Sequence, residues 1–137
     1  MADAKSGYIY ASDYYSILAF DPHDGGNVAP VIQLTGVHHQ FKYPYHILFF
    51  TLDHKGRVLA CGAGAIFIFA PLATGNAAPV TTIRHNCENI ATDTQGNIYT
   101  IASDELEEFA SSASGYARPI QRRTVLPLGG SYPLLIR

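Results

Sequence analysis

Histidines and polar side chains that could bind a ligand are concentrated in two segments of the sequence. Residues 36–46 hold three of the six histidines and three aromatic residues, and residues 85–89 read His-Asn-Cys-Glu-Asn. Imidazole binds transition metals and titrates near neutral pH, and loops on a rigid scaffold often carry binding function. We therefore interpret both segments as candidate binding loops. The candidate ligand-binding residues are His38, His39, Tyr45, His46, His85, Asn86 and Glu88.

The same two loops offer oxygen and nitrogen atoms that could hold a divalent cation, because carboxylates, amides and imidazoles ligate such ions in proteins. The metal candidates are Glu88, Asn86, Asn89 and His46. An alternative interpretation needs no ligand. In that case residues 36–46 form a variable loop whose aromatic side chains pack on the fold or on a subunit seam, and Glu88 is a solvated carboxylate or the partner of a histidine.

A catalytic thiol is a third interpretation of the second loop. Cys87 lies two positions after His85, and such positions share one face of a strand. Nucleophilic catalysis also needs an orienting group and an oxyanion site, and the sequence marks neither. We therefore expect no catalytic residue, and no cofactor beyond the divalent cation considered above. Cys61, within an apolar segment, is interpreted as a buried apolar side chain.

These loops belong to a chain that contains one motif three times, at residues 18–31, 67–80 and 107–120. Three sets of residues correspond between the copies: Phe20, Phe69 and Phe109; Gly26, Gly75 and Gly115; and Pro30, Pro79 and Pro119. Self-similarity at such a period indicates stacked supersecondary units. The first spacing is longer than the second because the loop that contains residues 36–46 is longer than its counterpart at residues 85–89. We interpret the prolines and glycines of the motif as turn and edge-protecting residues at the outer rim.

Each unit predicts strands rich in β-branched and aromatic residues, with turns marked by glycine, proline and asparagine. The expected strands are 8–12, 16–20 and 31–35; then 49–52, 58–61, 66–69 and 80–83; then 89–92, 98–101, 106–109 and 120–124. No stretch has a useful helical period. Residues 105–109 have helical propensity, but their alignment with 66–69 favours a strand.

Asp53 and Asp93 each lie three residues before a glycine, as an Asx-type turn between two strands would place them. The sequence before Gly7 shows nothing comparable. A segment that could supply the missing first strand occurs at the other end, at residues 131–137. We therefore expect three four-stranded sheets, circularly permuted by one strand.

Composition limits the classes of function. The 137 residues are 47% hydrophobic and 15% charged with a net charge of −2, so there is no basic surface for nucleic acid. No apolar run approaches a membrane span and no secretion signal is visible, so we expect a cytoplasmic protein without membrane or nucleic-acid partners. An exported mature domain remains the alternative. Two cysteines do not make a disulfide framework, and a reducing compartment is the default expectation.

The repeat, with Ile-Ala-x-Asp-x-x-Gly-Asn-Ile-Tyr at residues 90–99 and Gly-Asn-x-x-Pro-Val at 75–80, resembles the NHL-like and gluconolactonase-like β-propellers. The resemblance implies an all-β propeller of four-stranded antiparallel blades, with the strand before each glycine innermost. The expected domain is 1–137, with blade 1 at about 7–36, blade 2 at about 47–85 and blade 3 at about 88–125. Relatives typically have six blades, whereas this chain encodes three.

The resemblance therefore implies a homodimer that completes a six-bladed propeller, with residues 131–137 of each copy forming the innermost strand of the other copy's blade 1. Such an exchange would remove open sheet edges, which promote aggregation. A fragment of a longer propeller, a closed three-bladed ring and a trimer are the alternatives. The expected function is a non-catalytic binding or scaffold module whose channel mouth takes a small ligand or a protein. The alternatives are a divalent-metal-dependent hydrolase of the lactonase type and a fragment that serves assembly alone.

Overall fold

The computed structural model describes residues 1–3, 5–13, 15–35, 47, 49–62 and 64–125, and these form three antiparallel sheets. We call the sheets blades 1 to 3. Blade 1 contains β1 (Ile9–Ser12), β2 (Ser16–Phe20) and β3 (Ile32–Thr35). Blade 2 contains β4 (Phe49–Leu52), β5 (Val58–Gly62), β6 (Ala65–Phe69) and β7 (Thr81–Ile83). Blade 3 contains β8 (Asn89–Thr92), β9 (Ile98–Ala102), β10 (Glu105–Phe109) and β11 (Gln121–Thr124). The expected all-β fold is confirmed, including a strand at 105–109.

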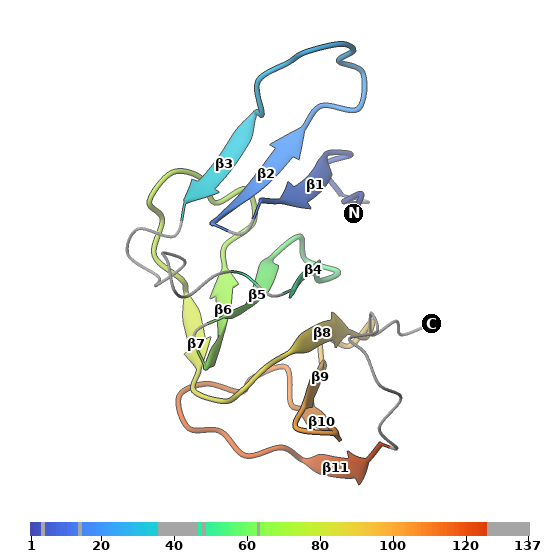
Figure 1. Cartoon of the computed structure of the whole chain (residues 1–137), viewed down its shortest axis with the longest axis vertical. Helices are drawn as coiled ribbons and strands as arrows, with labels where there is room; N and C mark the ends of the chain where they lie inside the picture. Colours follow the sequence, from blue (N-terminus) through green and yellow to red (C-terminus); the bar gives the residue numbers. More distant parts are fainter. Residues whose placement is uncertain (4, 14, 36–46, 48, 63, 126–137) are drawn as a thin grey trace.

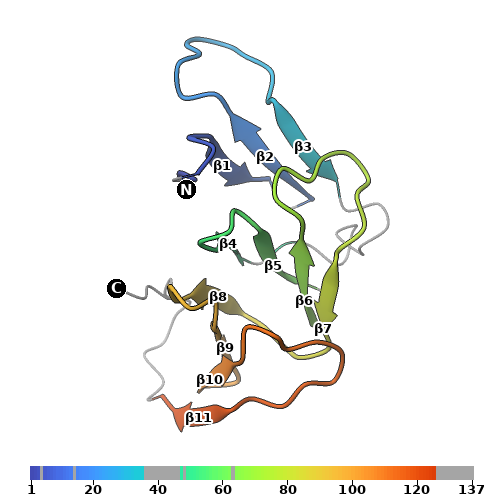
Figure 2. The ribbon, with the colours of Figure 1, turned by 180° about the vertical axis from the view of Figure 1, so that it is seen from behind.

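The three blades lie side by side and fan outward from a common region (Figures 1 and 2). The strands of each blade follow one another outward in sequence order, so β4 and β8 are innermost in their blades and contact each other. The outer strands β3, β7 and β11 lie far from this region. Within the described part of the chain, no helix is long and apolar enough to cross a membrane.

The burial of each blade depends on whether it has a neighbouring blade on one face or on both. Every residue of β5 and β6 is buried, because blade 2 has a neighbour on both faces, and such strands are apolar throughout. In β9 and β10 of blade 3, buried and half-buried residues mostly alternate, because the face toward blade 2 is covered and the other is not. Two hydrophobic clusters fill the two junctions between blades. Phe69 is central to the first and Phe109 to the second.

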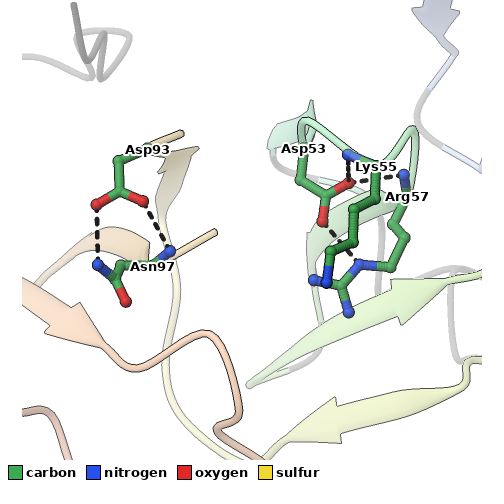
Figure 3. Close-up of polar contacts among 5 residues, drawn as sticks. All are labelled: Asp53, Lys55, Arg57, Asp93 and Asn97. Carbon is green, nitrogen blue, oxygen red and sulfur yellow. Dashed lines mark hydrogen bonds and ion pairs between the residues drawn. The ribbon is translucent and has the colours of Figure 1, made fainter. Parts of the chain in front are cut away.

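The turns at Asp53 and Asp93 have the predicted role (Figure 3). Asp53 accepts hydrogen bonds from the backbone N–H groups of Lys55 and Arg57, at 2.9 and 2.8 Å, and pairs with the Arg57 guanidinium at 2.7 Å. Asp93 does the same through Asn97, whose backbone and side-chain N–H groups both donate at 2.9 Å. Both aspartates therefore close the turn from the innermost strand to the next.

A third turn of this kind exists at the start of the chain, and the prediction that nothing comparable precedes Gly7 is wrong. Asp3 accepts hydrogen bonds from the backbone of Lys5 and Ser6, at 3.0 and 2.9 Å, and its carbonyl accepts one from Gly7 at 2.8 Å. Ala2 forms an antiparallel bridge with Ile9, so residues 1–3 occupy part of the innermost position of blade 1. The predicted exchange segment 131–137 lies outside the described residues.

In blades 2 and 3, the connection between the third and fourth strands reaches back to the preceding blade. Gly75 accepts a hydrogen bond from Thr35 N and donates one to Gln33 O, both at 2.8 Å. In the same way Gly115 accepts from Arg84 N at 2.7 Å and donates to Thr82 O at 2.8 Å. We call this contact the edge pairing. It covers the outer strand of the preceding blade, in agreement with the edge-protecting role expected for the motif.

Cys61 of β5 and Cys87 in the segment before β8 form a disulfide, and their Cα atoms are 5.3 Å apart. That separation is ordinary for a disulfide. Cys61 is buried in the second hydrophobic cluster, as expected, but its disulfide was not predicted, and the bond leaves Cys87 without the thiol that the thiol–imidazole interpretation needs. The bond ties blade 2 to the segment that leads into blade 3.

Candidate functional site

The best candidate site is an open cavity of about 550 Å³ at the junction between blades 2 and 3. It is bounded by the β5–β6 turn, the segment after β7, the β9–β10 turn and the edge pairing of blade 3. Its lining is mostly polar and consists of Gly64, Arg84, His85, Asn86, Ala102, Ser103, Glu105, Glu107, Tyr116 and Arg122.

A buried carboxylate organises this cavity. Glu107 on β10 is only 2% exposed. One of its oxygens pairs with His85 Nε2 and the other with Arg122 Nε, the latter at 2.9 Å. A nearly buried carboxylate is costly unless it is paired and hydrogen-bonded, and these two partners satisfy both of its oxygens.

The two partners come from different blades. Arg122 lies opposite Glu107 in the β10–β11 register, so the two side chains share one face of blade 3. His85 follows β7 of blade 2, and its ring and the Phe109 ring make a T-shaped contact at a centroid distance of 5.0 Å. The His85–Glu107 contact therefore joins blade 2 to blade 3 through a polar pair beside the hydrophobic cluster.

The remaining lining is rich in hydrogen-bond donors. Arg84 is exposed, and the Arg122 side chain is 55% exposed beyond its contact with Glu107. Asn86 and Ser103 add an amide and a hydroxyl, and Tyr116 adds an exposed phenol. Glu105, half-buried at the start of β10, is the one acidic acceptor in the lining besides Glu107.

The structure brings together two of the predicted binding residues and separates a third from them. His85 and Asn86 line the cavity, as their loop position suggested. Glu88 does not line it: its side chain is exposed, and its backbone N–H donates to Ile101 O at 2.9 Å. Asn89 is buried on β8, where its side-chain oxygen accepts from Ile90 N at 2.8 Å.

The other predicted residues, His38, His39, Tyr45 and His46, lie outside the described residues. Among the residues that the structure describes, no group of three or more histidine, cysteine, aspartate and glutamate side chains is arranged to hold a metal ion. Asn86 lines the cavity, Glu88 is exposed outside its lining and Asn89 is buried on β8, and a metal site formed by these residues with His46 stays a prediction.

Glu107 and Arg122 were missed in the sequence, although a signal for them exists. When the three units are aligned, Glu107 stands where the others have Leu18 and Phe67. A charge at a position that is otherwise apolar marks a local departure from the shared packing. Arg122 similarly replaces Gln33 and Thr82, and its position opposite Glu107 in neighbouring strands would have suggested the pair.

Comparison with protein-family models finds no match to this sequence, and comparison with curated proteins finds none either.

Proposed function

We propose that this chain is a non-catalytic binding module of the propeller type. The observation that carries the proposal is the polar cavity between blades 2 and 3, in which His85, Glu107 and Arg122 hold one another in place. A volume of about 550 Å³ is within the range of small-molecule sites. The position of the cavity at loops held by two sheets is typical of binding sites on rigid scaffolds.

The chemistry of the lining favours a small organic acid that carries hydroxyl groups. The carboxylate of Glu107 already engages one edge of Arg122, but the guanidinium has further N–H donors, and Arg84 supplies a second cation. A ligand carboxylate would accept from these groups. Hydroxyl groups would donate to Glu105 and accept from Asn86 or Ser103, and Tyr116 would lie against the carbon chain.

We further propose that two copies of the chain close a six-bladed ring. The support is the resemblance of the repeat to six-bladed propellers together with the three blade-like sheets in this chain. A ring of two copies would present the cavity twice, once in each chain. The cavity itself is built from one chain, so ligand binding does not depend on this closure.

D-gluconate is a suitable probe, with sorbitol as the uncharged counterpart of the same carbon number. NMR chemical-shift titration should show gluconate binding at His85 and Asn86, with sorbitol binding at least about tenfold more weakly because it lacks the carboxylate. Arg84→Ala should weaken gluconate binding about tenfold, whereas Arg118→Ala, an exposed arginine outside the cavity, should not. Equal responses to gluconate and sorbitol, or no effect of Arg84→Ala, would contradict the proposed ligand class.

A further inference from the structure

The first blade presents one half of a junction that the chain builds twice elsewhere. Ile9 on β1 is 45% exposed, whereas its counterparts Val58 and Ile98 are 2% and 0% exposed at the two internal junctions. Leu18 and Phe20 on the same face are only half-buried, although Phe69 and Phe109 at the position of Phe20 are fully buried. This face of blade 1 therefore has the apolar composition of a junction, and no blade among the described residues packs against it.

Within the described part of the chain, the connection between β2 and β3 of blade 1 also has no outer strand of a preceding blade with which to form an edge pairing. Gly26 corresponds to Gly75 and Gly115 and has the same left-handed backbone, with φ values of +79°, +60° and +59°. Val28, two residues later, is 37% exposed, whereas the equivalent Ala77 packs partly buried against the first hydrophobic cluster. The connection of blade 1 is thus folded for an edge pairing with a preceding blade.

Blade 3 presents the other half of such a junction, namely an outer strand and a face that no described blade covers. β11 has β10 as its neighbour on one side, and all four of its residues are exposed. Val125 N donates to Asp104 O of the β9–β10 turn. Because backbone groups alternate in direction along a strand, Arg122 O and Thr124 N point away from β10, toward the free edge. The free face of blade 3 holds a depression of about 270 Å³ beside Tyr99 and Leu106.

We propose that the free face and connection of blade 1 in one copy dock onto blade 3 of a second copy. In the register of the two internal edge pairings, Gly26 N donates to Arg122 O of the other copy, and Thr124 N of that copy donates to Gly26 O. The inference rests on the proposed ring of two copies and specifies its contact surface.

Charge supports this choice of partner. The blade 1 connection carries Asp21 and Asp24, while the edge it would meet carries Arg122 and Arg123. The free face of blade 3 is also more polar than the matching face of blade 2, since Glu108 and Arg123 stand where blade 2 has Ile68 and Ile83. Such polar substitution around an apolar centre is typical of interfaces between separate subunits.

The contact is tested by sedimentation velocity on the intact chain and three variants. Ile9→Glu places a carboxylate in both junctions of the ring and should weaken the dimer by at least about 100-fold. Thr124→Pro removes one donor at each junction and should weaken the dimer about 30-fold, while the blade survives because this N–H faces the free edge. Val80→Glu, at a residue that is 60% exposed on blade 2, is the matched control and should leave the dimer unchanged.

Hydrogen exchange on the unmodified chain gives a second measurement that does not depend on the folding of a variant. The Thr124 amide should become protected as the protein concentration rises through the dimerisation range, whereas Thr82 and Gln33 should not change. A dimer that resists both Ile9→Glu and Thr124→Pro, or a Thr124 amide that stays unprotected in the dimer, would overturn this contact while leaving the two-copy ring intact. A monomeric unmodified chain would overturn both, and gluconate binding is measured independently of either.

Discussion

The buried Glu107 carboxylate predicts an asymmetry between two substitutions in one polar cluster. Glu107 is nearly inaccessible, whereas the Arg122 side chain is 55% exposed. Removing Arg122 leaves a buried carboxylate with one partner fewer, while removing Glu107 leaves an arginine that water can solvate. The costs of the two substitutions should therefore differ, although both break the same ion pair.

The magnitudes follow from the burial of each partner. Arg122→Ala should lower the free energy of unfolding by about 2 kcal/mol, the usual range for a charge-assisted hydrogen bond lost from a buried acceptor. This is below the roughly 3–5 kcal/mol of a fully buried pair, because Arg122 is half in solvent. Glu107→Leu introduces the residue that blade 1 has at this position, and it leaves behind two partners that water can reach, since the Arg122 and His85 side chains are 55% and 23% exposed. We expect a change within about 1 kcal/mol of zero.

Urea unfolding followed by circular dichroism measures both values, at one protein concentration so that assembly contributes equally. Arg118→Ala is the control for loss of an exposed arginine and should change stability by less than about 0.5 kcal/mol. If Glu107→Leu destabilises the protein as much as Arg122→Ala, the ion pairs of the Glu107 carboxylate contribute more to stability than its burial costs, and the reasoning is refuted.

Three further predictions concern single groups. The Tyr10 hydroxyl and Thr100 Oγ1 are buried without a hydrogen-bond partner among the described residues. Tyr10→Phe and Thr100→Val should therefore leave the free energy of unfolding unchanged or raise it by up to about 1 kcal/mol. A loss above about 1 kcal/mol in thermal unfolding would reveal a partner. Desolvation raises the pKa of Asp93, but hydrogen bonds from the Asn97 side chain and from the Asn97 and Gln95 backbone outweigh it and hold the pKa below its ordinary value of 3.8. The stabilisation from Asp93 is therefore complete above pH 3.8 and is lost as the pH falls through the lower, folded-state pKa. In urea unfolding, the difference in free energy of unfolding between the unmodified chain and Asp93→Asn should shrink in acid. A difference that stays constant with pH would contradict this. Reduction of the Cys61–Cys87 disulfide, whose cysteines are 26 residues apart, should cost about 3 kcal/mol in urea unfolding, and in the unreduced protein neither thiol should react with iodoacetamide.

The sequence allowed the blades to be predicted because each unit repeats the same turn residues in the same order. Gly75 and Gly115 fix the register of the connections, and Asp53 and Asp93 fix the turns from the innermost strands. The equivalent turn at Asp3 escaped prediction because one additional residue separates Asp3 from its glycine, which removes the three-residue spacing that marks the other two.

The candidate site was predicted only in part, for a different reason. Its loop residues His85 and Asn86 stood out as polar residues between two strands. The group that organises the site, Glu107, lies within a strand, where an acidic residue is easily assigned to the solvent face. Whether it faces solvent or a neighbouring blade depends on the packing of blade 3 on blade 2, which no local pattern contains. The Cys61–Cys87 bond depends on the same packing.

The mass of the unmodified chain in solution tests the central claim most directly. A ring closed by two copies of a 14.9 kDa chain has twice that mass, about 30 kDa. Sedimentation equilibrium at micromolar concentration should give that value and the concentration dependence of a single monomer–dimer equilibrium. A species of 14.9 kDa at these concentrations would contradict the account, because both free halves of the blade junction would then remain exposed.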